Sequence, residues 1–483
     1  MGQDVERREF SRADRMRYRE KVRTNLDALT RMLEEVQFEC ERPLTGLEIE
    51  LNLVDEDAAP AMRNQAVLDA IADPDFVTEL GQWNIEINVP PDVLEGDGLH
   101  RFEQRVRGSL NAAEAKAAAI GTHTVMIGIL PTLRQDHLTH DSLSANPRYA
   151  LLNEQIFAAR GEDMLIQIEG TEGLATRCDS IAPEAACTSA QLHLQVTPAN
   201  FPTYWNAAQC IAGVQLALGA NAPYLFGREL WRETRIPLFE QATDTRAEEL
   251  KAQGVRPRVW FGERWITSIF DLFEENVRYF PALLPICEDE DPIAVLADGG
   301  VPKLGELTLH NGTIYRWNRP VYAVVKGRPH LRVENRVLPA GPTVVDIMAN
   351  AAFYFGLVRT LAEADRPVWT RMSFNAAEEN FHAGAKNGID AQLFWPGFGH
   401  ISAAELVLRH LLPMAHQGLD RSGVDPAHRD RLLGVIERRC VTLANGATWQ
   451  VGSAARHHGR LAGMLREYRE LMHANQPVHE WPS

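Results

Sequence analysis

Cysteine is scarce in this sequence, and its distribution argues against two common kinds of site. The 483 residues contain six cysteines and no C-x-x-C pair. Cysteines this far apart are typical of reduced thiols rather than of a disulfide framework or a structural zinc site. The sequence also lacks G-x-S-x-G, so nothing indicates a covalent serine nucleophile. The cysteines are Cys40, Cys178, Cys187, Cys210, Cys287 and Cys440.

Long apolar runs and a signal-peptide pattern are also missing. Residues 1–21 are rich in charge along their whole length, and no uninterrupted apolar run approaches the roughly 20 residues that cross a bilayer. We therefore expect a soluble, cytoplasmic protein without a membrane partner. The sequence leaves open whether the protein forms a homo-oligomer.

Positive charge is in deficit. The sequence has 49 Lys and Arg against 65 Asp and Glu, which gives a formal net charge of −16. This balance argues against general binding to nucleic acid, while it leaves room for a local basic site for phosphates. Neither G-x-x-x-x-G-K-[ST] nor G-x-G-x-x-G is present, so a nucleotide site here would be neither a P-loop nor a Rossmann turn.

The composition is that of a folded globular protein, with 45% hydrophobic and 24% charged residues. Alternating segments predict short strands, and apolar residues at helical spacing predict helices. Because strands and helices do not alternate regularly, the pattern favours an α+β fold over a doubly wound parallel sheet. The predicted helices are 11–38, 101–120, 206–220, 343–363, 402–416 and 455–474, and the predicted strands are 45–54, 83–89, 123–129, 188–196, 312–317 and 331–338.

The chain is expected to have three parts. We predict an N-terminal amphipathic helix in residues 1–42, a catalytic body in residues 43–400 and a helical C-terminal segment in residues 401–483. The Pro- and Asp-rich stretch 285–303 is predicted to be a loop.

Four predicted strands carry polar side chains on one face and mainly apolar side chains on the other. Successive side chains of a strand alternate between its faces, so residues i and i+2 share a face. The polar faces contain carboxylates, amides, imidazole or guanidinium groups, and none contains Lys. They are Glu48 and Glu50; Asn84, Glu86 and Asn88; Gln191, His193 and Gln195; and Arg332, Glu334 and Arg336.

These faces have two interpretations. Taken alone, each is most simply the solvent face of a half-buried antiparallel strand. Taken together, their carboxylates are oxygen donors of the kind that Mg²⁺ prefers, and His193 or Gln191 could complete the set. Crowded carboxylates repel one another, so a divalent cation is the natural compensation. Arg332 and Arg336 beside Glu334 suit a negatively charged substrate next to the metal.

Arginines near turn residues form a second group of candidates. Guanidinium groups pair bidentately with phosphate oxygens, so these side chains could form a phosphate-binding wall. Arg228 and Arg232 are instead predicted to lie on a helix and to form surface salt bridges. The candidates for the wall are Arg148, Arg235, Arg246 and Arg316.

Six segments, covering roughly residues 44–365, resemble the glutamate–cysteine ligase family in the family's own order. The resemblance is to its plant and proteobacterial branch and to the related family-2 carboxylate–amine ligases. Each pattern alone is weak, but six in the same order are specific. The segments are GLEIE, WNIEINVPP, GILPT with NPRYALLNE, CTSAQLHLQV, ANAPYLFGRELWRETRIPLFEQATDTR and HLRVENRVLPAG.

The resemblance implies a glutamine-synthetase-like fold, with a curved, mainly antiparallel sheet whose concave face is polar and which is flanked by helices. It also implies an ATP- and Mg²⁺-dependent ligase of glutathione biosynthesis. Such an enzyme activates the γ-carboxylate of glutamate as an acyl phosphate and joins it to the amino group of cysteine or a related amine. Activation is needed because a carboxylate is a poor electrophile until it carries a good leaving group.

The resemblance also implies roles for individual residues. Arg336 is expected to grip phosphate or the substrate carboxylate, and Arg148 and Arg235 to hold substrate or phosphate. The expected nucleotide-binding residues are Gln191, Arg246 and Arg316. The expected metal ligands are Glu48, Glu50, Glu86, His193 and Glu334.

Departures from the family pattern leave alternatives open. His193 stands where plant-type enzymes usually have Asn, so either Gln191 or His193 could reach the metal. The segment 168–186 is mostly polar or small and looks inserted, and it could reshape the amine pocket. The alternatives are a ligase for another amine or acid, a phosphotransferase of the same fold, or a binding protein without catalysis.

Overall fold

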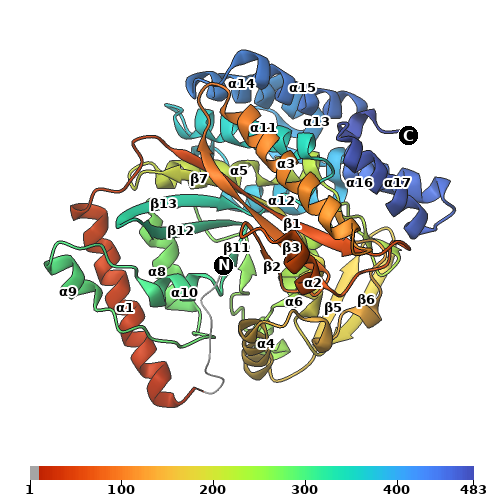
Figure 1. Ribbon diagram of the computed structural model, residues 1–483. Helices are drawn as coiled ribbons and strands as arrows, with labels where there is room; N and C mark the ends of the chain where they lie inside the picture. Colours follow the sequence, from red (N-terminus) through yellow and green to blue (C-terminus); the bar gives the residue numbers. More distant parts are fainter. Residues whose placement is uncertain (1–9, 483) are drawn as a thin grey trace.

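One curved, seven-stranded sheet forms the centre of the computed structural model, which describes residues 10–482 (Figure 1). Six strands follow the order β12-β13-β7-β1-β3-β2, β4 pairs with β1, and every neighbouring pair is antiparallel. The strands are β1 (Leu44–Val54), β2 (Phe76–Thr78), β3 (Asn84–Val93), β4 (His123–Val125), β7 (Ala190–Val196), β12 (Asn318–Val325) and β13 (Arg328–Asn335).

The apolar face of the sheet is buried under helices. Leu47, Ile49 and Leu51 of β1 point to this face and are at most 1% exposed. Helices α3 (Gly98–Ala118), α5 (Phe201–Gly219) and α11 (Val344–Ala362) pack over it (Figure 1). Among the described residues only α11 is long and apolar enough to span a membrane, but 94% of its apolar window is buried inside the protein. An apolar helix with this burial is a core helix.

The polar face looks toward a second set of elements. In Figure 1, α1, α8 and α10 lie below one end of the sheet, and α4, α6 and the β5–β6 hairpin lie below the other end. A short 3₁₀ helix, η3 (Ala182–Ala186), connects β6 to β7 and packs against α6. The bounds are α1 (Arg12–Glu35), α2 (Asn64–Ile71), α4 (Pro147–Arg160), β5 (Met164–Glu169), β6 (Gly173–Cys178), α6 (Arg235–Ala242), α7 (Glu248–Ala252), α8 (Ile269–Tyr279), α9 (Pro292–Ala297) and α10 (Gly305–Asn311).

The C-terminal helices pack onto the body of the protein. Both α14 and α15 contact α11, and one cluster of buried apolar side chains runs from Tyr18 to Trp481. The elements of this region are α12 (Phe374–Asn387), β14 (Gln392–Trp395), β15 (Gly399–Ser402), α13 (Ala403–Leu406), a π-helical turn (Val407–Leu411), α14 (Leu412–Arg421), α15 (Pro426–Thr442), α16 (Gly446–Arg456) and α17 (Leu461–Ala474). Two-stranded pairs are formed by β8 (Tyr224–Leu225) with β9 (Arg228–Glu229) and by β10 (Val259–Trp260) with β11 (Tyr315–Arg316).

The predicted α+β fold with a mainly antiparallel sheet is confirmed, but several local predictions are wrong, among them the single helix predicted for 455–474, which is interrupted between Arg456 and Leu461. The stretch 285–303 contains α9, which begins at a proline and is capped by Asp291. Arg228 lies in β9 and Arg232 in the following turn, not on a helix. In 312–317 only Tyr315–Arg316 is extended, because the preceding residues close the turn after α10. The segment 168–186, expected only as an insertion, contains most of the β5–β6 hairpin and η3.

Candidate active site

The strand register brings the four polar faces predicted from the sequence together on one surface. Their strands β3, β1, β7 and β13 are consecutive neighbours in the sheet. Side chains that are almost 290 positions apart along the chain are therefore adjacent in space. The directly opposed pairs are Glu50 with Glu86, Glu48 with Gln191, and His193 with Glu334.

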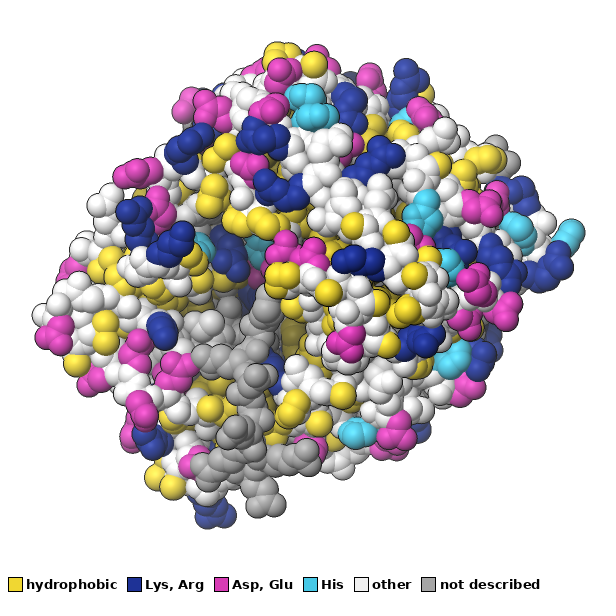
Figure 2. Space-filling view, viewed as in Figure 1, with side chains coloured by type: hydrophobic (Ala, Val, Ile, Leu, Met, Phe, Trp, Pro, Cys, Tyr) yellow, Lys and Arg dark blue, Asp and Glu magenta, His cyan; other side chains and the backbone are white. Residues whose placement is uncertain are grey.

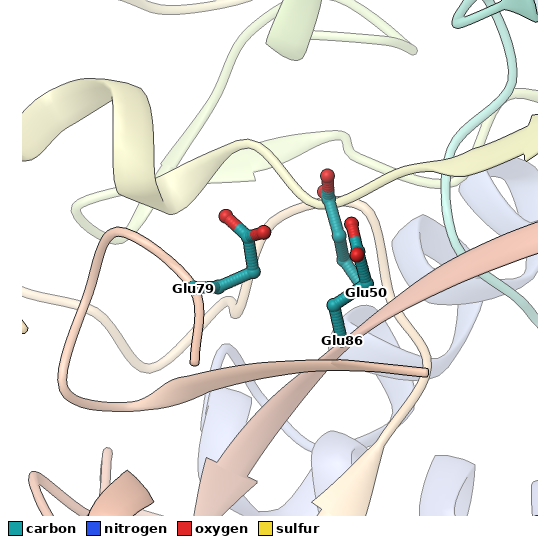
Figure 3. A group of neighbouring side chains, drawn as sticks. All are labelled: Glu50, Glu79 and Glu86. Atoms are coloured by element: carbon teal, nitrogen blue, oxygen red, sulfur yellow. The ribbon is translucent and has the colours of Figure 1, made fainter. Parts of the chain in front are cut away.

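Three carboxylates meet at one end of this polar face, and we call Glu50, Glu79 and Glu86 the carboxylate triplet (Figure 3). One oxygen from each lies within 4.8 Å of the other two. Glu50 comes from β1, Glu86 from β3 and Glu79 from the turn between β2 and β3. Within residues 10–482, no Lys or Arg forms an ion pair with any of the three.

Burial and mutual repulsion raise the pKa of the triplet carboxyls. For Glu50, burial and then the charge of Glu79 raise the pKa to about 7. Burial, followed by the charges of Glu79, Glu48 and Glu50, raises the pKa of Glu86 well above its usual value. Burial also raises the pKa of Glu79. A divalent cation would relieve this repulsion, and carboxylate oxygens are ligands that Mg²⁺ prefers, so the donor set fits Mg²⁺.

Gln191 connects the triplet to Arg336. Its Nε2 donates to Glu50 Oε1 at 2.9 Å, and its Oε1 accepts from Arg336 Nη1 at 2.9 Å. The second oxygen of Glu50 accepts the backbone N–H of Ser189 at 2.7 Å. Because both ends of its amide are engaged, Gln191 positions Glu50 and Arg336 rather than offering an open donor atom.

His193 lies between Arg332 and Glu48. Arg332 Nε donates to His193 Nδ1 at 3.0 Å, which places the hydrogen of the neutral ring on Nε2. This Nε2 is 3.0 Å from Glu48 Oε1 but makes no hydrogen bond of good geometry with a described residue. Burial alone would raise the pKa of Glu48, but His193 reverses the effect and the net shift is downward. Gln191 and His193 were the two candidates to reach the metal. Of these, Gln191 has both amide atoms hydrogen-bonded, whereas His193 has a ring nitrogen beside Glu48 that no described residue hydrogen-bonds.

Glu334 differs from the triplet because two arginines hold it. Arg319 donates from Nε to Oε2 at 2.8 Å and from Nη2 to Oε1 at 2.9 Å. Arg336 Nη1 donates to the same Oε1 at 2.8 Å. Burial would raise the pKa of Glu334, but Arg319 and Arg336 hold it well below its usual value. Glu334 is therefore ionised and already compensated.

A groove of about 880 Å³ opens at the Glu48 end of the polar face. Its volume lies in the range of small-molecule sites. The face of the molecule in Figure 2 is hollowed near its centre, with side chains of both charges around the hollow. The polar side chains that line the groove include Glu48, His193, Lys326, Arg328, His330 and Arg332.

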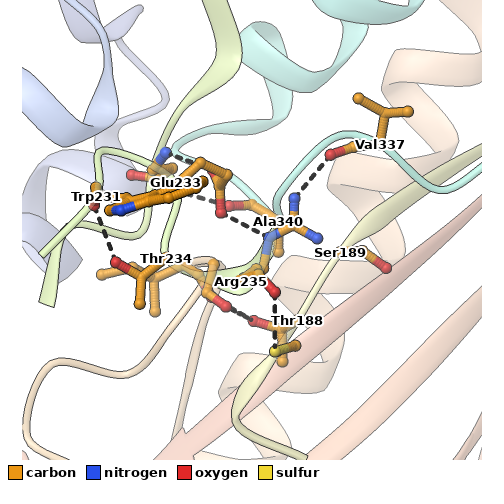
Figure 4. Close-up of polar contacts among 12 residues, drawn as sticks. Thr188, Ser189, Trp231, Glu233, Thr234, Arg235, Val337 and Ala340 are labelled. Carbon is orange, nitrogen blue, oxygen red and sulfur yellow. Dashed lines mark hydrogen bonds and ion pairs between the residues drawn. The ribbon is translucent and has the colours of Figure 1, made fainter. Parts of the chain in front are cut away.

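Arg235 is buried at the start of α6, and Figure 4 shows its guanidinium between Glu233 and Val337. Its Nε donates to Glu233 Oε1 at 2.8 Å, and its Nη2 donates to the backbone oxygen of Val337 at 2.8 Å. Its charge opposes the rise in the pKa of Glu50. Arg235 therefore joins α6 to the segment after β13 and acts on the triplet through its field.

Arg148 is the second residue of α4, whose first turn is capped by Asn146. Within residues 10–482 its guanidinium makes no ion pair and no hydrogen bond. Its charge acts on the hydroxyl groups of Tyr149 and Tyr315. Arg148 is thus a half-buried cation at the triplet end of the polar face.

The structure does not bring Arg246 and Arg316 to this group. Arg246 is held by Asp244, with Nε–Oδ1 and Nη2–Oδ2 distances of 2.8 and 2.9 Å. Arg316 is 1% exposed, donates to Glu275 Oε2 at 3.0 Å and stacks on the ring of Trp260 at 4.8 Å. The Arg246 guanidinium is held by its local partners, whereas Arg316 is held through Nη2 and its buried Nε and Nη1 have no hydrogen-bond partner among the described residues.

Sequence reasoning missed Glu79, the third member of the triplet. The signal for it was weak, because a three-residue strand before it offers too few residues for a period to show. Val77 of β2 pairs with Glu86 of β3, and this pairing sets the turn that carries Glu79 over the other two carboxylates.

Comparisons with known proteins identify the fold and the family of this chain. Among solved structures, glutamate–cysteine ligase from Francisella tularensis, in complex with AMP, matches with a TM-score of 0.58 and 12% identity over 90% of each chain, which shows a shared fold. A bifunctional glutathione synthetase from Pasteurella multocida matches with a TM-score of 0.49 and 12% identity over 94% of this chain and 55% of that chain. Among curated proteins, none matches the sequence. The profile of glutamate-cysteine ligase family 2 matches residues 44–449, so this chain belongs to that family.

Proposed function

We propose that this chain is an ATP-dependent carboxylate–amine ligase that activates the γ-carboxylate of glutamate and joins it to the amino group of cysteine or a related amine. One observation carries the proposal: a carboxylate triplet that forms no ion pair with any Lys or Arg of residues 10–482 lies on the same sheet face as Arg332 and Arg336. Phosphoryl transfer requires cations that neutralise phosphate oxygens and groups that hold the reactants in line. Family membership supports a ligase, and the Francisella enzyme with AMP supports nucleotide use.

The triplet would hold one Mg²⁺, and Glu48, which lies beside His193 Nε2 and near Glu334, would hold a second. Bound there, Mg²⁺ would neutralise the phosphate oxygens and orient the triphosphate. The protein orients the ligand carboxylates. Gln191 contributes to this because it hydrogen-bonds both Glu50 and Arg336.

The two ends of the polar face would take different substrates. The groove at the Glu48 end would take the nucleotide, because Lys326, Arg328 and Arg332 supply positive charge along it. The triplet end would take glutamate. The γ-phosphoryl group would then lie between them, above the β1 side chains.

The reaction has two steps. A γ-carboxylate oxygen of glutamate attacks the γ-phosphorus of ATP, the bond to the β–γ bridging oxygen breaks, and ADP leaves. The amine nitrogen then attacks the acyl carbon, the carbon–oxygen bond to phosphate breaks, and the amine gives up a proton. Arg336, which Glu334 and Gln191 hold in place, would neutralise the acyl phosphate between these steps.

The test is turnover with a panel of amines. Purified protein is mixed with ATP, Mg²⁺, L-glutamate and each amine, and ADP, inorganic phosphate and product mass are measured. We expect equal amounts of ADP and phosphate, with a γ-glutamyl amide as product, and no turnover in Glu86→Gln. ADP without phosphate would identify a phosphotransferase instead. No ADP with any amine, from a folded protein that binds ATP, would contradict the ligase.

A further inference from the structure

Helix α1, at the edge of the molecule in Figure 1, carries an exposed stripe of side chains along its length. The other side of the helix, where Tyr18, Val22 and Leu29 are buried, packs on α8, α9 and α10. Residues that recur at spacings of three or four lie on one helical face, and seven residues of α1 with these spacings are all exposed. We call this set the outer stripe: Arg12, Met16, Arg19, Arg23, Asp27, Thr30 and Glu34.

The charges of the outer stripe are unpaired within the chain. Its three arginines and two carboxylates form no ion pair with any residue of the described range 10–482. Arg31, on a different side of the same helix, does pair with Glu35, at 3.1 Å. The apolar member of the stripe, Met16, is 60% exposed. The outer stripe therefore has charges and an apolar side chain that another molecule can contact.

The order of charges along the outer stripe opposes the dipole of its own helix. A helix favours acidic side chains near its N-terminus and basic side chains near its C-terminus. Asp14 caps the first turn in this way, but the stripe begins with Arg12. It ends with Glu34 in a last turn that contains no basic residue. The stability of α1 therefore does not explain why the basic residues of the stripe come first and the acidic ones last.

The same order is complementary to a second copy of the stripe that runs in the opposite direction. A twofold axis at Arg23 places Arg12 opposite Glu34 of the second copy, and Arg19 opposite Asp27 of the second copy, and each contact occurs twice. Arg12 and Glu34 are each about 17 Å from the axis, because a helix rises 1.5 Å per residue, so the pairs stay in register. The two copies of Arg23 meet at the axis, with an Asp27 one turn away on either side.

We propose that the outer stripe is a dimer interface, in which α1 packs antiparallel against α1 of a second copy of this chain. The four ion pairs use charges that have no partner in the single chain, so no existing ion pair is broken. The antiparallel arrangement brings the positive end of each helix dipole to the negative end of the other. It also covers Met16, which then lies opposite Thr30 of the second copy.

The charges favour a second copy of this chain over other anionic partners. Residues 12–23 carry six basic and two acidic side chains, which attract an acidic surface. Asp27 and Glu34 in the same stripe, together with the net charge of −16, repel nucleic acid and anionic lipid. In about 0.15 M salt the Debye length is about 8 Å, so repulsion between the two net charges is largely screened while ion pairs in contact persist.

Two charge-swapped variants test the interface. One carries Arg12→Glu and Arg19→Glu, and the other carries Asp27→Arg and Glu34→Arg. Each variant alone brings like charges together across the axis, whereas a mixture of the two restores all four ion pairs. Sedimentation velocity over a range of protein concentrations, in about 0.15 M salt, gives the mass and the dimer Kd of each variant and of the mixture.

The expected result is a dimer that each variant loses and the mixture regains. The Kd of each variant alone rises about tenfold or more, and the equimolar mixture recovers the wild-type Kd as a heterodimer. Raising the salt to about 1 M dissociates the wild-type dimer, because exposed ion pairs are then screened. The control is Arg107→Glu with Arg438→Glu, which makes the same change in net charge as the first variant at exposed sites of α3 and α15 and keeps the wild-type Kd. Both stripe variants keep or exceed the wild-type Tm, because each removes charges that oppose the helix dipole.

Four outcomes would overturn the proposal. Wild-type protein that is monomeric at every concentration would show that no such dimer forms. Variants that dimerise as tightly as wild type would place the interface elsewhere. Variants that are monomeric both alone and in the mixture would contradict the antiparallel pairing. Binding of monomeric wild-type protein to phosphatidylserine vesicles, lost in the variant with Arg12→Glu and Arg19→Glu, would assign the outer stripe to an anionic lipid surface instead.

Discussion

Single buried carboxylates on the polar face differ in what compensates their charge. Glu334 is bonded to two arginines, whereas the triplet carboxylates accept neutral donors from Ser189, Gln191 and the turn backbone. Removing a charge should therefore have opposite effects in the two places. A substitution of equal volume separates the electrostatic effect from packing.

Glu86→Gln should stabilise the protein without metal and abolish its response to Mg²⁺. At pH 8 the free energy of unfolding should rise by about 1–3 kcal/mol, because the raised pKa of Glu86 means that its ionised form destabilises the folded state. The sign follows from linkage. When the pKa of a carboxyl is higher in the folded state than in the unfolded state, the free energy of unfolding falls as the pH rises from the unfolded-state pKa to the folded-state pKa. Urea unfolding with and without Mg²⁺ measures both effects.

Glu334→Gln should do the reverse and lower the free energy of unfolding by about 3 kcal/mol, because it leaves Arg319 and Arg336 without their shared counter-ion. The measurement is the same urea titration. If Glu334→Gln were as stable as wild type, Arg319 and Arg336 would not depend on the charge of Glu334. If Glu86→Gln were destabilised, the charge of Glu86 would not be a burden on the folded state.

His310 of α10 should give stability a pH dependence of its own. Its Nε2 bonds the backbone oxygen of Asn276 at 2.9 Å, its buried Nδ1 has no hydrogen-bond partner in the part of the chain that the structure describes, and burial lowers its pKa from 6.5 to about 4. Between these values the unfolded state binds the proton more readily. Stability is therefore complete above pH 6.5 and falls as pH drops toward 4, by about 3 kcal/mol.

The check is a comparison with His310→Gln. Wild-type and variant proteins are unfolded in urea at pH 7.5 and pH 5, and the drop between the two should be smaller in the variant. Equal drops would show that His310 is not buried as a neutral ring.

Among elements, the strands of the polar face were predictable and their surroundings were not. A period of two assigns Glu48, Glu50, Glu86 and His193 to polar faces from local sequence alone. What orders the strands is long-range pairing, such as β7 with β13, which local sequence does not encode. Arg316 shows the same limit, because its partner Glu275 is 41 positions away and nothing near Arg316 in the sequence indicates it.

Two helices behind the sheet, α5 and α12, pack with their backbones very close together. The sequence pattern indicated the apolar character of α5 but not how closely the two helices approach each other. A Cβ at Gly213 of α5 would collide with the backbone oxygen of Asn380 in α12, and one at Gly384 would collide with that of Gly213. Helix α5 also packs against β13, which carries Glu334. The spacing of α5 and α12 thus supports the strand that holds the site.

Gly213→Ala should lower the free energy of unfolding by about 1–3 kcal/mol, because the two backbones must move apart. The matched control is Gly434→Ala in α15, where a Cβ meets nothing within 4 Å. That change should be neutral or stabilising by about 1 kcal/mol, since Ala is the better helix former. Thermal unfolding of the two variants measures the difference, and equal stabilities would contradict the close packing of α5 on α12.

Across the whole molecule, the ends of the chain are bonded to its middle. Tyr18 of α1 donates to the backbone oxygen of Glu306 at 2.8 Å. The backbone N–H of Val478 donates to Asp346 Oδ2 at 3.0 Å. The division of the chain at residues 42 and 400 stays a prediction, but these contacts lead us to expect that the parts unfold together.

The buried ion pair between Asp346 of α11 and Arg439 of α15 offers the sharpest test of that expectation. The two side chains are 0% and 1% exposed, and Arg439 Nη2 lies 2.8 Å from Asp346 Oδ1. Arg439→Met should leave Asp346 uncompensated and cost about 3–5 kcal/mol. In a chain of this length that corresponds to a fall in Tm of about 3–5 °C.

Calorimetry distinguishes the two possibilities, with Arg438→Met, an exposed neighbour on the same helix, as control. If the C-terminal helices and the sheet share one core, Arg439→Met shifts a single transition downward and Arg438→Met leaves it in place. Mg²⁺ with ATP should raise that same transition, because a ligand of the polar face then stabilises every element coupled to it. A new low-temperature transition in Arg439→Met, insensitive to Mg²⁺ and ATP, would instead show that residues after 400 fold as a separate unit.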